Sequence, residues 1–252
     1  MKVLGINTAT LFGSIGLVDG DGVLGEYSLN VPGTHSERLM TCIDRLLTDT
    51  KVPIERIDGF AITLGPGSFT GLRIGISTVK GLAFATDRPV VGVSTLEALA
   101  LNVRDCSNQI CPILDARKRE TYAALFRVAS SRRMKRLTPD LVIAPRDLAE
   151  LIDGSVTFLG DGLKVYGGYL KRRLGRRASF VSPELGYVRG TIVALMGAKL
   201  LMKGKVLDLS SFGPHYIRRS EAEIKDEERV RKNAPGGGYA WPIVKRISSE
   251  DS

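Results

Sequence analysis

The order of apolar segments in the first hundred residues constrains the fold most strongly. Short apolar runs cover Lys2–Ile6, Ser14–Val18 and Val23–Val31, and the last two flank the tetrad Asp19-Gly20-Asp21-Gly22. Aspartate and glycine tolerate the positive φ angles that tight hairpin turns require, so this tetrad is a strong hairpin signal. The chain is therefore predicted to begin with three strands that can pair antiparallel.

Helices with one apolar face are predicted to alternate with strands after this hairpin. Thr34-His35-Ser36-Glu37 has the S/T-x-x-E pattern of a capping box, which opens a helix over residues 36–48. A second box, Ser94-Thr95-Leu96-Glu97, opens a helix that ends near residue 103. Between these helices the pattern predicts a buried strand over 59–64, a helix over 70–85 and a strand over 90–93.

This order is that of the ribonuclease H-like core, which actin-like proteins contain twice. A second copy is indicated by the apolar run 109–114, the polar Asp115 and the run 121–128, which are spaced much as in the first half. The predicted fold class is therefore α/β, an actin-like (ASKHA, ribonuclease H-like) fold with two degenerate halves. Less regular patterns predict helices over 145–151, 165–174 and 191–201, a strand over 156–159 and a turn at 160–162.

Three regions are expected along the chain: an N-terminal ribonuclease H-like domain over 1–104, a degenerate second actin-like domain over 105–206, and an extended or partly disordered tail over 207–252. The tail is predicted because this region has no periodic apolar face, alternates charges and contains Pro235-Gly236-Gly237-Gly238. The only tryptophan, Trp241, lies there and could anchor the tail or a partner.

Composition predicts a globular protein that needs neither metal nor disulfides to fold. The chain has 252 residues, of which 43% are hydrophobic and 25% charged. Its three cysteines, Cys42, Cys106 and Cys111, form no CxxC pair, so neither a disulfide framework nor a zinc knuckle is expected. No run reaches the roughly 18 to 20 apolar residues of a membrane span. The protein is expected to be cytoplasmic, without membrane contact.

Charge is unevenly distributed. Residues 1–100 contain 8 Lys/Arg and 10 Asp/Glu, whereas residues 101–252 contain 28 and 17. Only the second half could therefore attract an anionic partner such as RNA, although a charge that maintains solubility explains the asymmetry about equally well. The basic runs 117–119, 132–136 and 171–177 contain few interleaved aromatics, so they are interpreted mostly as solvated faces and not as a stacking platform for single strands.

The stretch Gly65–Lys80, GPGSFTGLRIGISTVK, is the most informative motif. It looks at first like a phosphate-binding loop, but its spacing matches neither GxGxxG nor GxxxxGK[ST]. Small residues instead recur every four positions, at Gly67, Gly71, Gly75, Val79 and Ala83, which lets another backbone approach closely. Spacing does not decide whether that backbone belongs to this chain or to a partner; packing within the chain is somewhat favoured.

Candidate cofactor residues are few. A zinc site at His35 would need a second ligand one turn later, where Leu39 stands, so no metal site is predicted. Asn7, followed by Thr8, ends the first strand, where an actin-like ATPase places a carboxylate toward magnesium and phosphate. Asp115 is the matching position of the second half. Because only one of these two positions has a carboxylate, weak nucleotide binding at most is predicted. No catalytic Ser-His-Asp or Cys-His set can be assembled from the sequence.

Several segments together resemble the TsaB (YeaZ) family: KVLGINTAT with GSIGLV, THSERL, GPGSFTGLRIGISTVKGLAFA, VVGVSTLEALA, LDARKRETYAALF and PHYIRRSEAE. The resemblance covers nearly all of residues 1–127, thins between 130 and 205, and returns at 214–223. It implies a non-catalytic, actin-like paralogue of TsaD, the subunit that transfers a threonylcarbamoyl group to the adenosine beside the tRNA anticodon. TsaD-like proteins carry paired metal-binding histidines on their first helix, where this chain has only His35.

The resemblance further implies that the first two helices contact a TsaD-like partner in a heterodimer, or a second copy of this chain in a homodimer when it is alone. A TsaE-like ATPase would join the assembly, and tRNA would be met only through the complex. ATP or ADP is possible at the complex interface, with no cofactor bound tightly by this chain. Many members have aspartate where Asn7 stands, which weakens the case for nucleotide binding. The residues implied at the partner contact are His35, Leu39, Met40, Ile43, Leu47, Gly71, Leu72, Gly75, Ile76 and Val79.

The leading hypothesis is an accessory partner subunit, and Gly75→Leu or Ile76→Asp would then break the heterodimer. The alternative is a stand-alone actin-like ATPase or kinase, which ATP turnover abolished by Asp115→Ala would favour. A metallopeptidase, an older label for relatives, would require one tightly bound zinc per chain.

Overall fold

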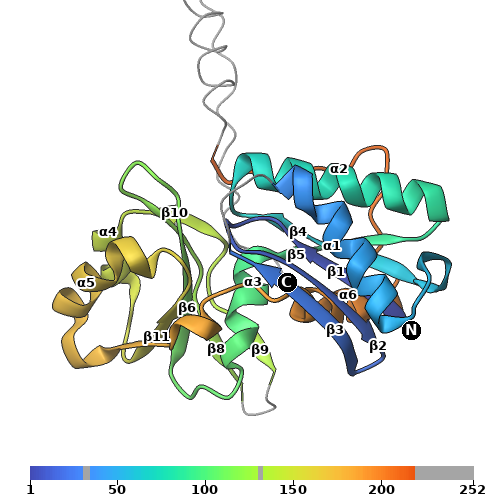
Figure 1. Cartoon of the computed structure of the whole chain (residues 1–252). Helices are drawn as coiled ribbons and strands as arrows, with labels where there is room; N and C mark the ends of the chain where they lie inside the picture. Colours follow the sequence, from blue (N-terminus) through green and yellow to red (C-terminus); the bar gives the residue numbers. More distant parts are fainter. Residues whose placement is uncertain (31–34, 130–132, 219–252) are drawn as a thin grey trace, which may run out of the picture. The chain divides into compact units, whose positions relative to one another are not determined.

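The computed structural model describes residues 1–30, 35–129 and 133–218, with only the backbone described at 35–37. Residues Met1–Arg218 form one compact unit, in which two β-sheets are flanked by helices (Figure 1). Thr34 of the first predicted capping box, the glycine run 236–238 and Trp241 lie outside the described residues.

The N-terminal half contains a five-stranded sheet in the order β3-β2-β1-β4-β5. The first three strands pair antiparallel, and β4 and β5 extend the sheet in parallel from β1. The predicted DGDG turn joins β2 to β3, with Gly20 at φ 59°. The elements of this half are β1 (Lys2–Asn7), β2 (Gly13–Asp19), β3 (Gly22–Leu29), α1 (His35–Thr50), η1 (Ile54–Arg56), β4 (Gly59–Gly65), α2 (Phe69–Thr86), β5 (Val90–Ser94), α3 (Thr95–Ala100) and η2 (Leu101–Val103).

The second half repeats this arrangement, with its main sheet path in the order β10-β7-β6-β11-β12. Here β6, β7 and β10 pair antiparallel, and β11 and β12 are added in parallel, so the predicted pair of degenerate halves is confirmed. The elements of this half are β6 (Gln109–Asp115), β7 (Thr121–Ala123), β8 (Phe126–Val128), β9 (Met134–Arg136), β10 (Leu141–Ile143), α4 (Pro145–Leu151), β11 (Val156–Leu159), α5 (Leu163–Leu174), η3 (Gly175–Arg177), β12 (Ala178–Phe180) and η4 (Pro183–Leu185). The last helix of the described residues, α6 (Gly190–Met202), returns to the first sheet.

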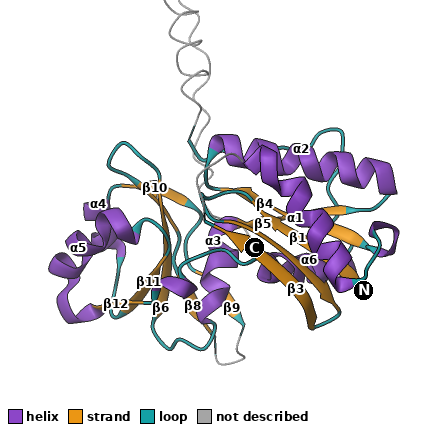
Figure 2. Ribbon diagram, in the orientation of Figure 1, coloured by secondary structure: helices purple, strands orange, loops and turns teal. Residues whose placement is uncertain are grey.

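Alternation along β1 divides the core between the two faces of the first sheet. Leu4 and Ile6 pack with apolar residues of α1 and α2, whereas Val3 packs with Val193 and other residues of α6. Side chains of successive strand residues point to opposite faces, so α1 and α2 cover one face of this sheet and α6 covers the other (Figure 2).

Helix α6 lies very close to the sheet. A Cβ atom on Gly5 would stand 2.3 Å from the backbone nitrogen of Ala194, and one on Gly16 would stand 2.2 Å from that of Thr191, so only glycine fits at these two positions. The segment Pro183–Met202 is the one stretch among the described residues that is long and apolar enough to cross a membrane by composition. Because its residues Gly190–Ala194 are buried, we interpret α6 as a core helix.

Some elements differ from the predictions. Strands β9, β10 and β12 were not predicted, because three residues are too few to show an alternating pattern. The strand predicted over 121–128 is split, since β7 pairs with β6 and β10, whereas β8 pairs with β6 at Ile110 and with β9.

Residues 207–218, at the start of the predicted tail, contain no helix or strand. They are nevertheless anchored, because the Leu207 nitrogen donates to the Val90 carbonyl (2.8 Å) and the His215 nitrogen to the Leu64 carbonyl (2.7 Å). The division of the chain at about residues 104 and 206 stays a prediction.

Candidate functional site

Helix α2 begins where the GPGSFTG motif predicts. The Ser68 side chain caps it by accepting a hydrogen bond from the Gly71 nitrogen (3.2 Å), and Asp87 in the left-handed region ends it. Capping of this kind satisfies backbone N–H groups that have no partner within the helix. The serine of the motif therefore caps its own helix, which agrees with a structural role of the motif within this chain.

The small-residue stripe of α2 packs inside the chain. A Cβ atom on Gly75 would lie 2.2 Å from Thr8 Oγ1 and 3.1 Å from Ile62 Cδ1, and one on Gly67 would lie 2.2 Å from the Ala9 carbonyl oxygen. These glycines allow α2 to approach the β1–β2 turn and β4. The expectation that they bring α2 against another subunit is therefore corrected.

This packing also revises the residues assigned to the partner contact. Met40 remains 50% exposed and Leu47 is half-buried, while only the backbone of His35 is described. The partner contact itself stays a prediction. The other seven predicted residues are buried within this chain: Leu39, Ile43, Gly71, Leu72, Gly75, Ile76 and Val79. Of these seven, Ile43 lines the groove described next.

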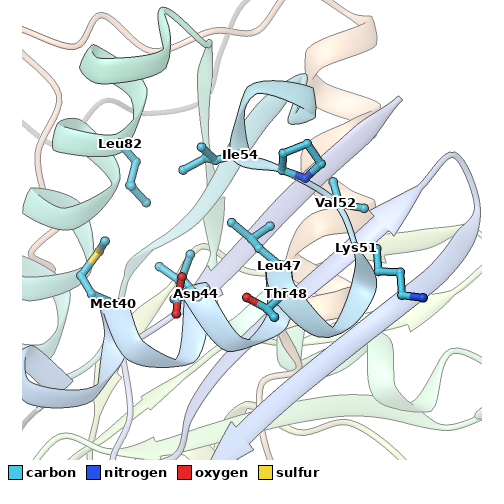
Figure 3. A pocket seen from close by; sticks show the side chains of 10 residues that line it. Met40, Asp44, Leu47, Thr48, Lys51, Val52, Ile54 and Leu82 are labelled. Carbon is cyan, nitrogen blue, oxygen red and sulfur yellow. The ribbon is translucent and has the colours of Figure 1, made fainter.

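An accessible apolar surface remains between the two helices. An open groove of about 420 Å³ lies between α1, α2 and the segment that joins α1 to β4. Figure 3 shows Met40 and Leu47 on α1, Leu82 on α2 and Ile54 on the connecting segment around this groove. We call it the α1–α2 groove; its lining residues are Met40, Ile43, Asp44, Leu47, Thr48, Lys51, Val52, Pro53, Ile54 and Leu82.

Seven of the ten groove residues were missed in the sequence, and two of them, Ile54 and Leu82, show why. Ile54 lies in the short turn η1, directly after Pro53, where no periodic pattern exists to reveal it. Leu82 lies on the flank of α2 beside the small-residue stripe, and a helical projection of Gly65–Lys80 extended by one turn would have included it. On the same helix, Phe84 is 85% exposed.

Asn7 is used structurally at the end of β1. It is fully buried, and its Nδ2 donates to the Phe12 carbonyl (3.1 Å), while its Oδ1 accepts from the Ala9 nitrogen (3.2 Å) and Thr63 Oγ1 (3.1 Å). A buried amide engaged in this way holds the β1–β2 turn. Thr8 Oγ1, beside Gly75, is buried without a hydrogen-bond partner among the described residues.

Asp115 occupies the matching position at the end of β6. Its Oδ1 accepts hydrogen bonds from the Arg117 nitrogen (2.9 Å) and Tyr166 Oη (3.4 Å), and its Oδ2 lies 3.4 Å from Arg117 Nη1. The structure adds Asp161, from the predicted turn after β11, whose Oδ1 accepts from the Asp115 nitrogen (3.2 Å). Burial raises the pKa of Asp161, and the charge of Asp115 acts in the same direction.

Among the side chains that the structure describes, no three of His, Cys, Asp or Glu are grouped so that they could hold a metal ion.

Comparison with known proteins identifies the family. The family model described as TsaD, tRNA N6-adenosine threonylcarbamoyltransferase, matches residues 30–225. The "tRNA threonylcarbamoyladenosine biosynthesis protein TsaB" of Bacillus subtilis is 30% identical over 228 residues, which cover 89% of this chain and 97% of that protein. This chain belongs to the TsaB family.

Two further relatives agree with this assignment to TsaB. TsaB of Escherichia coli is 26% identical over 229 residues, 88% of this chain and 96% of that protein. The structure of YeaZ from Pseudomonas aeruginosa has a TM-score of 0.72 and 26% identity, over 86% of this chain and 99% of that one. The resemblance to TsaB (YeaZ) and the actin-like α/β fold predicted from the sequence are confirmed.

Proposed function

We propose that this chain acts in the biosynthesis of threonylcarbamoyladenosine in tRNA as a non-catalytic subunit that docks a TsaD-like transferase through the α1–α2 groove. Membership of the TsaB family supports the pathway. The observation that carries the docking role is the groove itself, because apolar side chains from two helices stay accessible there.

The groove has the composition of a docking surface. Met40, Leu47, Ile54 and Leu82 provide an apolar floor, and the exposed Asp44 and Lys51 provide charges of opposite sign at its edge. A contiguous apolar surface with a polar rim marks protein interaction sites. An amphipathic helix of the partner would fill such a groove with side chains spaced three and four residues apart. In the absence of that partner, the same groove would form a homodimer.

The chemistry is assigned to the partner. Asn7 provides an amide whose polar atoms are engaged within the chain, which leaves Asp115 as the one carboxylate of the two matching strand ends. ATP or ADP would then be held at the subunit interface, with no cofactor bound tightly by this chain. We further propose that a TsaE-like ATPase joins the assembly, that tRNA is engaged through the complex, and that the protein acts in the cytoplasm.

Co-elution with a TsaD-like partner on size-exclusion chromatography tests the docking role, starting from the wild-type chain. Ile76→Asp and Gly75→Leu are unsuitable for this purpose, because both positions are buried and the variants would unfold. Met40→Asp changes the groove without entering the core, so it is the informative variant. A wild-type chain that elutes alone from an equimolar mixture with the partner would overturn the proposal.

The alternative, a stand-alone actin-like ATPase or kinase, has the pair Asp115 and Asp161 as its best candidate site. ATP turnover by the purified chain that Asp115→Ala abolishes would establish that activity and reverse the ranking of the two functions.

A further inference from the structure

The three basic runs of the second half have different environments. Arg136, from the second run, pairs with Asp140 (2.5 Å) and Glu97 (3.5 Å). Arg117, from the first run, pairs with Asp115 (3.4 Å). These two arginines are occupied by contacts within the chain. The third run, 171–177, differs from the other two in that its cations project from the end of a helix.

Helix α5 ends in this third run. Lys171, Arg172 and Arg173 form its last turn, and Gly175, at φ 59°, reverses the chain so that Arg176 and Arg177 follow in η3. All five basic side chains are exposed. We call this cluster the basic end of α5.

Few carboxylates neutralise the basic end of α5. Arg173 lies 3.9 Å from Glu150, which is also 3.5 Å from Arg146, and Arg177 donates to the Ile152 carbonyl (3.3 Å). In the described part of the chain, Arg172 and Arg176 have no ion-pair partner. A helix C-terminus favours one or two nearby cations, but five in seven residues repel one another. The excess charge is therefore available to an anionic partner.

An aromatic ring stands beside these cations. Phe180 ends β12, at the edge of the second sheet path, and is 36% exposed. Its ring stacks on the buried Phe158, with centroids 5.8 Å apart and an interplanar angle of 21°, and Lys171 Nζ lies 5.8 Å from its centroid. Phe158 thus holds the exposed ring in place. Phe180 follows the basic run by only three residues in the sequence, but it is the pairing of β12 with β11 that places its ring on Phe158.

We propose that the basic end of α5 and Phe180 form a binding surface for RNA, in which the cations contact backbone phosphates and the ring stacks on an unpaired base. This inference deepens the proposed function and rests on it, because it assigns to this subunit a direct contact with the tRNA of the complex. Cations beside an exposed aromatic are the combination that binds single-stranded nucleic acid. Membrane-binding surfaces also combine cations with aromatics, but they insert the apolar side chain into the bilayer. The Phe180 ring is only 36% exposed and packed on Phe158, so it offers a surface for stacking and not a side chain for insertion, which favours RNA.

The test is a titration of a fluorescently labelled tRNA transcript with the full-length chain, alone and with the TsaD-like partner, over a series of salt concentrations. The variant Arg172→Gln/Arg176→Gln removes the two unpaired cations. The matched control, Lys203→Gln/Lys205→Gln, removes two exposed cations that follow α6. Phe180→Leu keeps an apolar side chain and removes the stacking surface.

We expect Arg172→Gln/Arg176→Gln to weaken binding about tenfold near 0.1 M salt and to lower the slope of log K against log salt by about 1 to 2, since each phosphate contact contributes roughly 0.7 to 0.9. The control should change affinity less than twofold. Phe180→Leu should weaken binding to an unpaired oligonucleotide at least fivefold, and binding to an RNA duplex much less.

Three results would overturn the inference. The first is no RNA binding by the wild-type chain, either alone or with the partner, and the second is an equal loss of RNA affinity in the arginine-pair and the lysine-pair variants. The third is stronger binding to vesicles containing anionic phospholipid than to RNA. Co-elution of the same variants with the TsaD-like partner separates this inference from the docking proposal. If the partner co-elutes but RNA binding is independent of Arg172 and Arg176, only the RNA contact is wrong. If RNA binding depends on them but the partner never co-elutes, only the docking proposal is wrong.

Discussion

Replacing Met40 by aspartate is the perturbation that tests the α1–α2 groove most directly. Met40 is 50% exposed, so about half of its side chain is free to be covered by a partner. Full burial of a methionine side chain stabilises by about 1.5–3 kcal/mol, and covering the exposed half therefore contributes about 1 kcal/mol to docking.

Met40→Asp loses that contribution and places a carboxylate in a contact from which water is excluded. Leaving a charged group without a partner in such a contact costs about 2–3 kcal/mol more. The total of about 3–4 kcal/mol corresponds to a roughly 100- to 1000-fold loss of affinity, because each factor of ten corresponds to about 1.4 kcal/mol.

The stability of the free chain should change little in this variant. The new carboxylate stands one helical turn before Asp44, and a like-charge pair at this spacing costs about 0.2–0.5 kcal/mol. Isothermal titration calorimetry with the TsaD-like partner measures the affinity, and thermal unfolding should show a Tm within about 2 °C of the wild type. The control is Met202→Asp, the same change at a 73% exposed methionine that ends α6, on the other face of the first sheet.

Partner affinity of Met40→Asp within threefold of the wild type, together with an unchanged Tm, would refute the assignment of the groove as the contact. Equal losses in Met40→Asp and Met202→Asp would instead indicate a general effect of charge. Phe84→Asp, at the 85% exposed position of α2, would report whether the contact extends across the outer side of that helix.

Three further predictions concern stability and nucleotide chemistry. Gly5→Ala should destabilise the chain by about 2–3 kcal/mol in urea unfolding, because the new Cβ would stand 2.3 Å from the α6 backbone; Gly81→Ala in α2, with nothing within 4 Å, should stabilise it by about 0.5–1 kcal/mol. The pKa of the Asp161 carboxyl is raised in the folded state, so just above pH 3.8 the folded chain keeps a proton that the unfolded chain has lost. The stability of the wild type therefore falls as the pH rises from 3.8 through the raised pKa of Asp161. Asp161→Asn should therefore be more stable than the wild type in urea unfolding at pH 7 and equal to it below pH 3.8. Asp115→Ala should leave phosphate release from ATP at the background level of the wild-type chain.

Local patterns were sufficient for most elements of the fold. The Asp19–Gly22 turn, the Ser94 cap and the helical spacing of Leu39, Ile43 and Leu46 depend on residues within a few positions of one another. Such short-range signals are contained in the sequence. They predicted the order of strands and helices in the first half and, from the repeat around Asp115, the second half. Strands of three residues, such as β12, carry no such signal and were missed.

Which surface faces outward was decided by the tertiary structure alone. The four-residue spacing through Gly75 defined one face of α2 but not what covers it, and it is Thr8, from a distant turn, that lies there. The same reason explains why the amide of Asn7 is engaged with Thr63, 56 residues away, and why Phe180 stacks on Phe158. Periodicity determines the direction of a side chain relative to its own helix or strand, whereas the pairing of distant strands determines what that side chain meets.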